Sequence, residues 1–359
     1  MSRGAEFLAR ITDDRRRRVA AMKAAVPEAV LRERLPAPIS AGRLATVLRR
    51  DGAADAIRLL CEVKRASPSK GMLNEHVDPV QLASLYAAGG AAAVSLVTEP
   101  DHFKGDLTWM NRVRPAVTLP LLLKDFVIDS YQLLDAADRG ADAVLLLAAL
   151  LSRDTMERLI GEARALGLDA LVEVHTSDEM QAALDAGATI IGINHRNLHT
   201  FELDMSLSER LLPLIPASHV AIAESGISHP DELRRLRSTR CDAVLMGEVF
   251  ARATDPAATL TEHREVERLS PAAALLSAII GGLVVGSISG APLTVTGPAA
   301  GLITLAFQIV HEHGFRGLMF ATVVAGILQL AMSWLRLGGL IAHLPEAILE
   351  GVLGGIGLI

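Results

Sequence analysis

The chain has 359 residues, a formal net charge of −6 and only 3% aromatic residues. An acidic balance with few aromatic side chains excludes the basic patch and the base-stacking platform of a nucleic-acid-binding protein, so no nucleic-acid partner is expected. Cys61 and Cys241 lie in apolar runs without disulfide or metal-ligand spacing. This usage is typical of a reducing compartment. Residues 1–18 are rich in charge and lack an apolar core, so no signal peptide is predicted.

The chain opens with a charged segment that precedes the first apolar run. Residues 5–35 predict one or two solvated helices, and we treat residues 1–50 as a helical extension. The apolar run at 57–61 then predicts a strand that delivers Glu62 and Lys64. Because a strand repeats every two residues, both charged side chains project to the same side. A small-residue turn follows at once, which indicates a polar site at this strand end or, more simply, a surface ion pair.

The next two hundred residues alternate short apolar runs with longer amphipathic ones. The apolar runs are nearly continuous in Val, Ile, Leu and Ala, as parallel strands covered on both faces are. A glycine ends the preceding helix at Gly90, Gly140 and Gly187, which marks repeated helix-to-strand joints. The predicted strands are 57–63, 93–97, 119–123, 143–147, 169–174, 190–194, 220–224 and 243–246.

Eight such units predict an α/β fold, a (β/α)8 TIM barrel over residues 51–258. An open doubly wound sheet is disfavoured, since no Gly-x-Gly-x-x-Gly follows the first strand.

Charged and amide side chains gather where these strands end. Barrel enzymes build their sites from the C-terminal ends of the strands, so these residues converge on one mouth. A single charge there is often structural, but two lysines with two carboxylates predict an active site, because burial tunes their pKa values toward acid and base roles. The residues are Glu62, Lys64, Lys124, Glu173, Asn194 and Arg196.

Two glycine-containing turns follow the last two predicted strands, Ser225–Gly226 and Gly247–Glu248. At this place in a barrel, backbone N–H groups often bind a phosphate. Ser67 adds a hydroxyl from the first loop. A phosphorylated small-molecule substrate is therefore predicted.

Five motifs in this order resemble indole-3-glycerol phosphate synthases of tryptophan biosynthesis: EVKRASPSKG at 62–71, KDF at 124–126, EVH at 173–175, INHRNL at 193–198 and ESGI at 224–227. The resemblance runs from about Phe7 to Ala258. It implies a carboxy-lyase that closes the indole ring of 1-(2-carboxyphenylamino)-1-deoxyribulose 5-phosphate with loss of CO2 and water, without a metal or other cofactor.

The resemblance also implies a role for each residue. Lys124 is the general acid at the ribulose carbonyl oxygen, and Lys64 holds the anthranilate carboxylate. Glu173 is the general base for dehydration, and Glu62 orients the lysines. The remaining matched positions hold the substrate: Asn194 and Arg196 position the carboxylate, Ser225 contacts substrate, and Ser67, Gly226, Gly247 and the backbone of Glu248 surround the phosphate.

The composition changes beyond Arg268, where only five charged residues follow. Residues 269–311 and 317–335 carry no charged side chain, and a membrane span needs about 20 apolar residues. We therefore predict a linker at 259–271 and an all-α membrane-type segment at 272–359; a buried helical hairpin in a soluble protein is the alternative.

The sequence GAPLTVTGPAAG at 290–301 resembles the third-span region of the SulP anion permeases, and 328–340 and 351–358 continue the resemblance. In that family a half-helix N-terminus faces the anion. The segment matches only a truncated part of such a transporter, so transport by this chain is not expected. A fusion joint between 256 and 272 is predicted.

Two other functions stay open at this point. One is another ribulose-phosphate barrel, such as a phosphoribosylanthranilate isomerase. That enzyme uses a cysteine–aspartate acid–base pair, in which Cys61 would be the cysteine. The other is a membrane anion-transporter fragment with a non-catalytic soluble domain. For the main interpretation we expect a cytoplasmic catalytic domain, membrane contact through 272–359 and association with other tryptophan-pathway enzymes.

Overall fold

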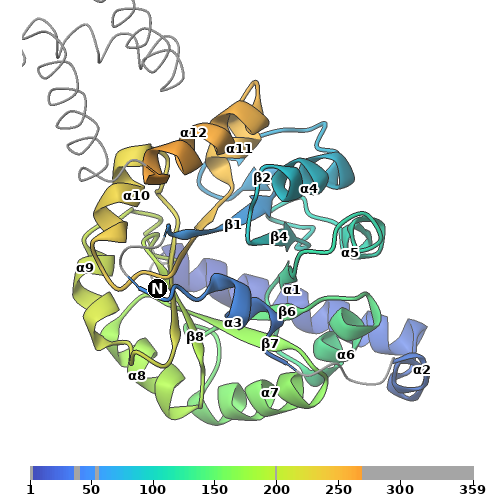
Figure 1. Ribbon diagram of the computed structural model, residues 1–359. Coiled ribbons are helices and arrows are strands. Elements are labelled where there is room, and N and C mark those ends of the chain that lie inside the picture. Colours follow the sequence, from blue (N-terminus) through green and yellow to red (C-terminus); the bar gives the residue numbers. More distant parts are fainter. Residues whose placement is uncertain (1–2, 36–40, 53–55, 199, 269–359) are drawn as a thin grey trace, which may run out of the picture. The chain divides into compact units, whose positions relative to one another are not determined.

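A computed structural model describes residues 3–35, 41–52, 56–198 and 200–268, and its centre is a closed barrel of parallel strands (Figure 1). Going around the barrel, β1 pairs with β10 on one side and with β4 on the other, so the sheet has no open edge. The barrel strands are β1 (Arg58–Val63), β4 (Ala93–Val97), β5 (Leu121–Lys124), β6 (Ala143–Leu147), β7 (Asp169–Val174), β8 (Ile190–Asn194), β9 (Val220–Glu224) and β10 (Ala243–Met246).

Helices follow the barrel strands and form a ring outside them (Figure 1). A two-stranded hairpin, β2 (Ala66–Ser67) with β3 (Gly71–Met72), lies in the loop after β1. The helices of the ring are α4 (Pro79–Ala88), α5 (Thr108–Val113), α6 (Ser130–Asp138), α7 (Arg153–Ala165), α8 (Ser177–Asp185), α9 (Leu207–Leu211) with the 3-10 turn η1 (Leu212–Leu214), α10 (Pro230–Arg237), α11 (Glu248–Arg252) and α12 (Pro256–Arg268).

The predicted barrel is confirmed, and so are the positions of its strands to within two residues. The largest shift is at β5, predicted from 119 but beginning at Leu121. Pro120 precedes it and has no N–H to donate to a strand ladder. The strand ends on Lys124, so this lysine belongs to the sheet itself.

Left-handed glycines end the helices as predicted. Gly90, Gly140 and Gly187 have φ values of 81°, 78° and 82°, a conformation that side chains with a Cβ rarely adopt. Each turns the chain from a helix into the next strand within a few residues. These joints keep all the strands pointing the same way.

Alternate residues of each strand enter two separate apolar cores. In β1, Cys61 and Val63 pack outward with Tyr86 beneath the helices. Leu60 points inward and packs with residues of the other strands inside the barrel. Glu62 is two residues beyond Leu60 and shares its inward direction, so the period of the strand places a carboxylate at the interior end of an apolar column.

The helical extension closes the N-terminal end of the barrel through α3 (Arg43–Leu48). Leu44 and Leu48 are fully buried in the interior core. The backbone N–H groups of Leu44 and Ala45 donate to Asp169 Oδ2 at 2.8 and 3.1 Å. Because Asp169 is the first residue of β7, this contact fixes α3 over the strand starts.

The extension also reaches the opposite end through its first helix. The charged helices expected at 5–35 are present as α1 (Arg3–Ala25) and α2 (Glu28–Arg34). Arg15 of α1 forms a buried ion pair with Asp125 at 2.5 Å. Asp125 directly follows Lys124, so α1 helps to fix the end of β5.

The last described helix, α12, packs on the barrel. Leu260 and His263 are buried, and the His263 ring lies 6.1 Å from that of Phe250. Residues 256–268 are therefore helical, although the sequence predicted a linker from 259. The predicted membrane segment, 272–359, lies outside the described residues. Within the described ranges, no helix combines the length and apolarity that crossing a bilayer requires.

We expect Leu260→Ala to lower the free energy of unfolding of fragment 1–268 by about 2–5 kcal/mol, because a fully buried leucine leaves a cavity. Urea unfolding followed by circular dichroism measures this. The matched control is Leu214→Ala, which removes an equal volume from a side chain 54% exposed and should change the value by less than about 0.5 kcal/mol. Equal effects of both substitutions would show that α12 does not stabilise the barrel.

Candidate active site

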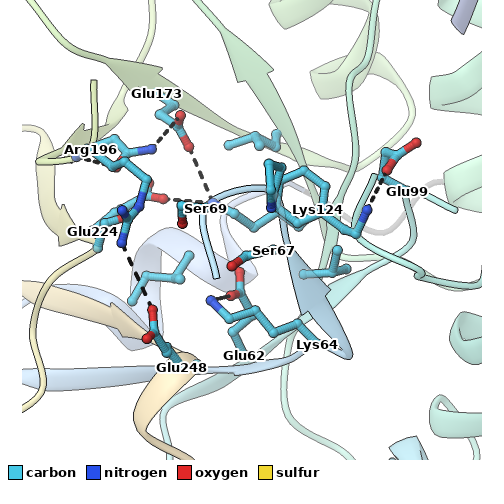
Figure 2. Close-up of a pocket in the computed structure, with 18 of the residues that line it drawn as sticks. Glu62, Lys64, Ser67, Ser69, Glu99, Lys124, Glu173, Arg196, Glu224 and Glu248 are labelled. Atoms are coloured by element: carbon cyan, nitrogen blue, oxygen red, sulfur yellow. Dashed lines mark hydrogen bonds and ion pairs between the residues drawn. The ribbon is translucent and has the colours of Figure 1, made fainter. Parts of the chain in front are cut away.

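Polar side chains from five strands meet at the C-terminal mouth of the barrel (Figure 2). They line one cavity that opens to solvent at the mouth. The predicted site residues all line this cavity: Glu62, Lys64, Ser67, Lys124, Glu173, Asn194, Arg196, Ser225, Gly226, Gly247 and Glu248.

Lys124 is the centre of the arrangement. Its Nζ lies 2.7 Å from Glu224 Oε2 and 3.3 Å from Glu173 Oε2 (Figure 2). Both carboxylates are almost completely buried, whereas the Lys124 side chain keeps 18% of its surface exposed. The ammonium group is therefore held between two acids and still reaches the cavity.

A second ion pair lies on the neighbouring side of the mouth. Lys64 Nζ is 2.7 Å from Glu62 Oε1, and the Lys64 side chain is 16% exposed. Asn194 Nδ2 donates to Glu173 Oε1 at 2.8 Å. Two amines, three carboxylates and one amide thus form a compact polar cluster above an apolar interior.

Two glycines make room for this cluster. A Cβ on Gly192 would overlap Glu224 Oε1, and a Cβ on Gly247 would lie 2.6 Å from Glu62 Oε1. Side chains at either position would push a carboxylate out of place. The small residues of β8 and of the turn after β10 are thus part of the site although they carry no reactive group.

The pKa values of the cluster are shifted by opposing causes. Burial lowers the pKa of Lys124, but the charges of Glu224, Glu173 and Glu62 together outweigh it and raise the pKa above its ordinary value. Lys124 is therefore protonated near neutrality, as a general acid must be.

The two acids beside Lys124 differ in protonation. Burial raises the pKa of Glu224 to about 7, against the opposing charge of Lys124. For Glu173, burial is outweighed by Lys124, His175 and the hydrogen bond from Asn194, so its pKa is lowered. Glu173 is therefore the ionised acid of the pair, which suits a general base.

The other half of the mouth contains a turn with an unusual backbone conformation. Ser225 and Gly226 both have left-handed backbones, with φ of 66° and 77°. A Cβ on Gly226 would lie 2.6 Å from Met205 Sδ, so glycine is required there. Glu248 directs its carboxylate toward Arg196 at 3.9 Å. Only its backbone can therefore face a phosphate without charge repulsion.

The model of the indole-3-glycerol phosphate synthase family matches residues 8–263. The chain belongs to this family. It is 47% identical over 206 residues to the indole-3-glycerol phosphate synthase of Sulfurimonas denitrificans, covering 57% of this chain and 78% of that protein. It is 44% identical over 210 residues to the enzyme of that name from Aliarcobacter butzleri, covering 58% and 80%.

A second family model, that of the sulfate permease family, matches residues 265–359. The two matches adjoin without overlapping, and both resemblances drawn from the motifs are thereby confirmed. All but the first four residues of the second match lie outside the described ranges.

Cys61, on which the isomerase alternative relies, faces away from the mouth. Its side chain is fully buried in the outer core with Val63 and Tyr86. Burial also raises the pKa of the Cys61 thiol well above its ordinary value. Cys61 does not line the cavity, whereas Lys64 and Lys124 do.

Glu224, a member of the cluster, and His175, which lies against Glu173, are within the sequence motifs but are not among the predicted site residues. Both carry a usable signal. Glu224 is an acid at the end of an otherwise apolar strand, as Glu173 is. His175 is two residues beyond Glu173 and so lies on the same side. In the described part of the chain, no group of three or more His, Cys, Asp or Glu side chains could hold a metal ion.

We expect Gly192→Ala to displace Glu224 and destabilise fragment 1–268 by about 1–3 kcal/mol, since the added methyl overlaps a buried carboxylate. Gly161→Ala is the matched control. Gly161 lies in α7 with open space where the methyl group would go, and alanine should stabilise the helix by up to about 1 kcal/mol. Opposite signs in urea unfolding are the expected outcome; two stabilised variants would contradict the packing around Glu224.

Glu224 also predicts a pH dependence of stability. Its pKa in the folded protein, about 7, lies above the ordinary 4.5. Between these values the folded state binds more protons than the unfolded chain, so stability contributed by Glu224 is lost as pH rises. Relative to Glu224→Gln, wild-type fragment 1–268 should lose about 3 kcal/mol between pH 4.5 and pH 8 in urea titrations. A constant difference between the two proteins would refute the raised pKa.

Proposed function

We propose that the barrel catalyses the indole-3-glycerol phosphate synthase reaction at this mouth: ring closure of 1-(2-carboxyphenylamino)-1-deoxyribulose 5-phosphate, followed by loss of CO2 and of water. The single observation that carries the proposal is the Lys124 ammonium held between Glu173 and Glu224 while still reaching the cavity. A group that must donate a proton to a carbonyl oxygen needs this combination of fixed charge and access.

Ring closure requires the aromatic carbon that bears the carboxylate to attack the ribulose carbonyl. Lys124 donates a proton to the carbonyl oxygen, which makes the carbonyl carbon electrophilic. Lys64 is placed to pair with the substrate carboxylate, since Glu62 holds its ammonium within the same cavity at 2.7 Å. Asn194 and Arg196 would complete the positioning, because a tight pocket must hold the two reacting carbons close together.

The later steps remove CO2 and water from the ring-closed intermediate. Loss of CO2 returns an electron pair to the ring and restores its aromaticity. The hydroxyl made in the first step then leaves as water, with a proton from an acid. Glu173 removes a proton from the neighbouring carbon of the substrate, which comes from the ribulose. Its lowered pKa keeps it ionised before this step.

The phosphate would bind at the other side of the mouth. The hydroxyls of Ser67 and Ser225 and the backbone at Gly226, Gly247 and Glu248 line that side of the cavity. Gly226 leaves the backbone of this turn uncovered by a side chain, so a phosphate could approach it closely. The phosphate would thereby anchor the substrate at the end remote from Lys124.

The remaining expectations concern the segment beyond the barrel. We propose that residues 272–359 contact the membrane while the catalytic domain lies in the cytoplasm; the support is the uncharged stretches and the match to the sulfate permease family. Association with other enzymes of tryptophan biosynthesis stays a prediction. The described residues that line the cavity lie between residues 62 and 248.

Lys124→Ala in the full-length chain should lower kcat by about 10²–10⁴-fold, the usual contribution of a positioned acid. Formation of the indole product is followed by its fluorescence in both the membrane and the soluble fraction of expressing cells. Lys23→Ala is the control, since Lys23 pairs with Asp129 on the exposed face of α1 and should leave the rate unchanged. A folded wild-type chain that forms no indole in either fraction would refute the proposed function, and activity confined to the soluble fraction would refute membrane contact.

A further inference from the structure

A buried histidine stands directly behind the proposed base. His175 follows β7, and its Nε2 lies 3.4 Å from Glu173 Oε1. On its other side, Nδ1 lies 3.2 Å from Glu179 Oε2, which also accepts the His175 backbone N–H at 2.7 Å. The side chain of His175 is only 7% exposed. Nothing in the steps above uses it.

The position of Glu179 fixes which ring nitrogen carries a proton. A carboxylate only accepts, so Nδ1 donates to Glu179. Nε2 then faces Glu173 and has no hydrogen-bond partner among the described residues. In a neutral ring that nitrogen would present a lone pair to the lone pairs of a carboxylate, which repel it. A proton between Nε2 and Glu173 removes the repulsion.

The surrounding charges favour this extra proton. The acids that face the ring are Glu173 from β7, Glu179 from α8 and Glu224 from β9. Burial lowers the pKa of His175, but the hydrogen bond to Glu179 and these three charges outweigh it and raise the pKa above its ordinary value. The geometry and the charges agree that the imidazole is a proton-loaded group.

The proposed reaction consumes one proton from outside the substrate. A proton goes to the carbonyl oxygen in ring closure, and a second leaves with the hydroxyl as water. Only one proton is taken back, by Glu173 from the substrate carbon. The carboxylate leaves as CO2 and supplies none. We take Lys124 as the acid in both steps. Its ammonium gives one proton in ring closure and becomes a neutral amine, so it must regain a proton before dehydration.

We propose that His175, oriented by Glu179, stores the proton that reloads Lys124 within a single turnover. This inference rests on the proposed function. After ring closure, the imidazolium gives its Nε2 proton to Glu173, and Glu173 passes a proton to the neutral amine of Lys124 across the 3.3 Å contact. The ring becomes neutral and keeps its Nδ1 proton. Lys124 is then an acid again and Glu173 a carboxylate, as dehydration requires.

After product leaves, water in the open cavity supplies a proton to Glu173, which lines the cavity, and Glu173 passes a proton to Nε2 across the 3.4 Å contact. His175 touches no substrate atom in this scheme. It acts through Glu173 and is a positioning residue that also holds a proton. Glu179 sets the tautomer and stabilises the imidazolium, as a carboxylate behind a histidine does in other acid–base sites.

The test is a single-turnover experiment on the full-length chain in detergent, with CO2 release and indole fluorescence followed together. In the wild type both signals should rise at the same rate. In His175→Asn, CO2 should be released before indole forms, because ring closure uses the proton already on Lys124 whereas dehydration waits for a solvent proton. Steady-state kcat should fall about tenfold or more with KM within about twofold of wild type.

Two further variants separate proton storage from a structural role. His219→Asn is the matched control; His219 lies at the start of β9, at the opposite end of the barrel, and the two signals should stay together. Glu179→Gln keeps an acceptor for Nδ1 but removes the charge that stabilises the imidazolium, so it should give a smaller separation of the signals. It decides the question if His175→Asn does not fold, as judged by circular dichroism.

The outcomes distinguish the two levels of inference. Simultaneous CO2 and indole signals in a folded His175→Asn, with kcat unchanged, would overturn proton storage by His175 and leave the synthase reaction intact. A wild-type chain that releases neither CO2 nor indole would overturn the synthase reaction itself. A uniform loss of both signals in His175→Asn, without a lag between them, would overturn proton storage and assign the histidine to support of the site alone.

Discussion

A lysine held between two buried glutamates is the constraint on which the rest of this barrel depends. Removing charges from water costs several kcal/mol per ion, and that cost is offset only when opposite charges meet in good geometry. Lys124 meets Glu224 at 2.7 Å and Glu173 at 3.3 Å at the end of an apolar interior. These three residues come from β5, β9 and β7, so the pairing requires the strands to be brought around into a closed barrel.

Closure also decides where the charged groups can lie. Inward positions lower in the strands are filled by Leu60, Leu122 and Leu171, which exclude water beneath the site. The acids occupy the last inward position, where the interior opens to the cavity. Gly192 and Gly247 leave room for them, and Arg15 of the extension holds Asp125 beside Lys124. The groups are therefore fixed before substrate arrives, which is the condition for electrostatic stabilisation of a transition state.

The chain matches two family models in adjoining parts. Every residue of the cavity lies within the match to the synthase family, and α12 completes the packing of that part through Leu260 and His263. The match to the sulfate permease family begins at residue 265, within α12. The described residues that line the cavity all precede the second match.

Sequence alone determined the barrel and most of its mouth. Runs of Val, Ile and Leu at regular spacing, separated by amphipathic stretches and glycine joints, specify parallel strands wrapped by helices, and the period of two places Glu62 with Lys64. Those are local properties of the chain. The tertiary structure alone decided that Glu224 and Glu173 share Lys124 and that Arg15 pairs with Asp125. Such pairings depend on strand order, register and closure, which join residues far apart in the sequence and leave no periodic trace in it.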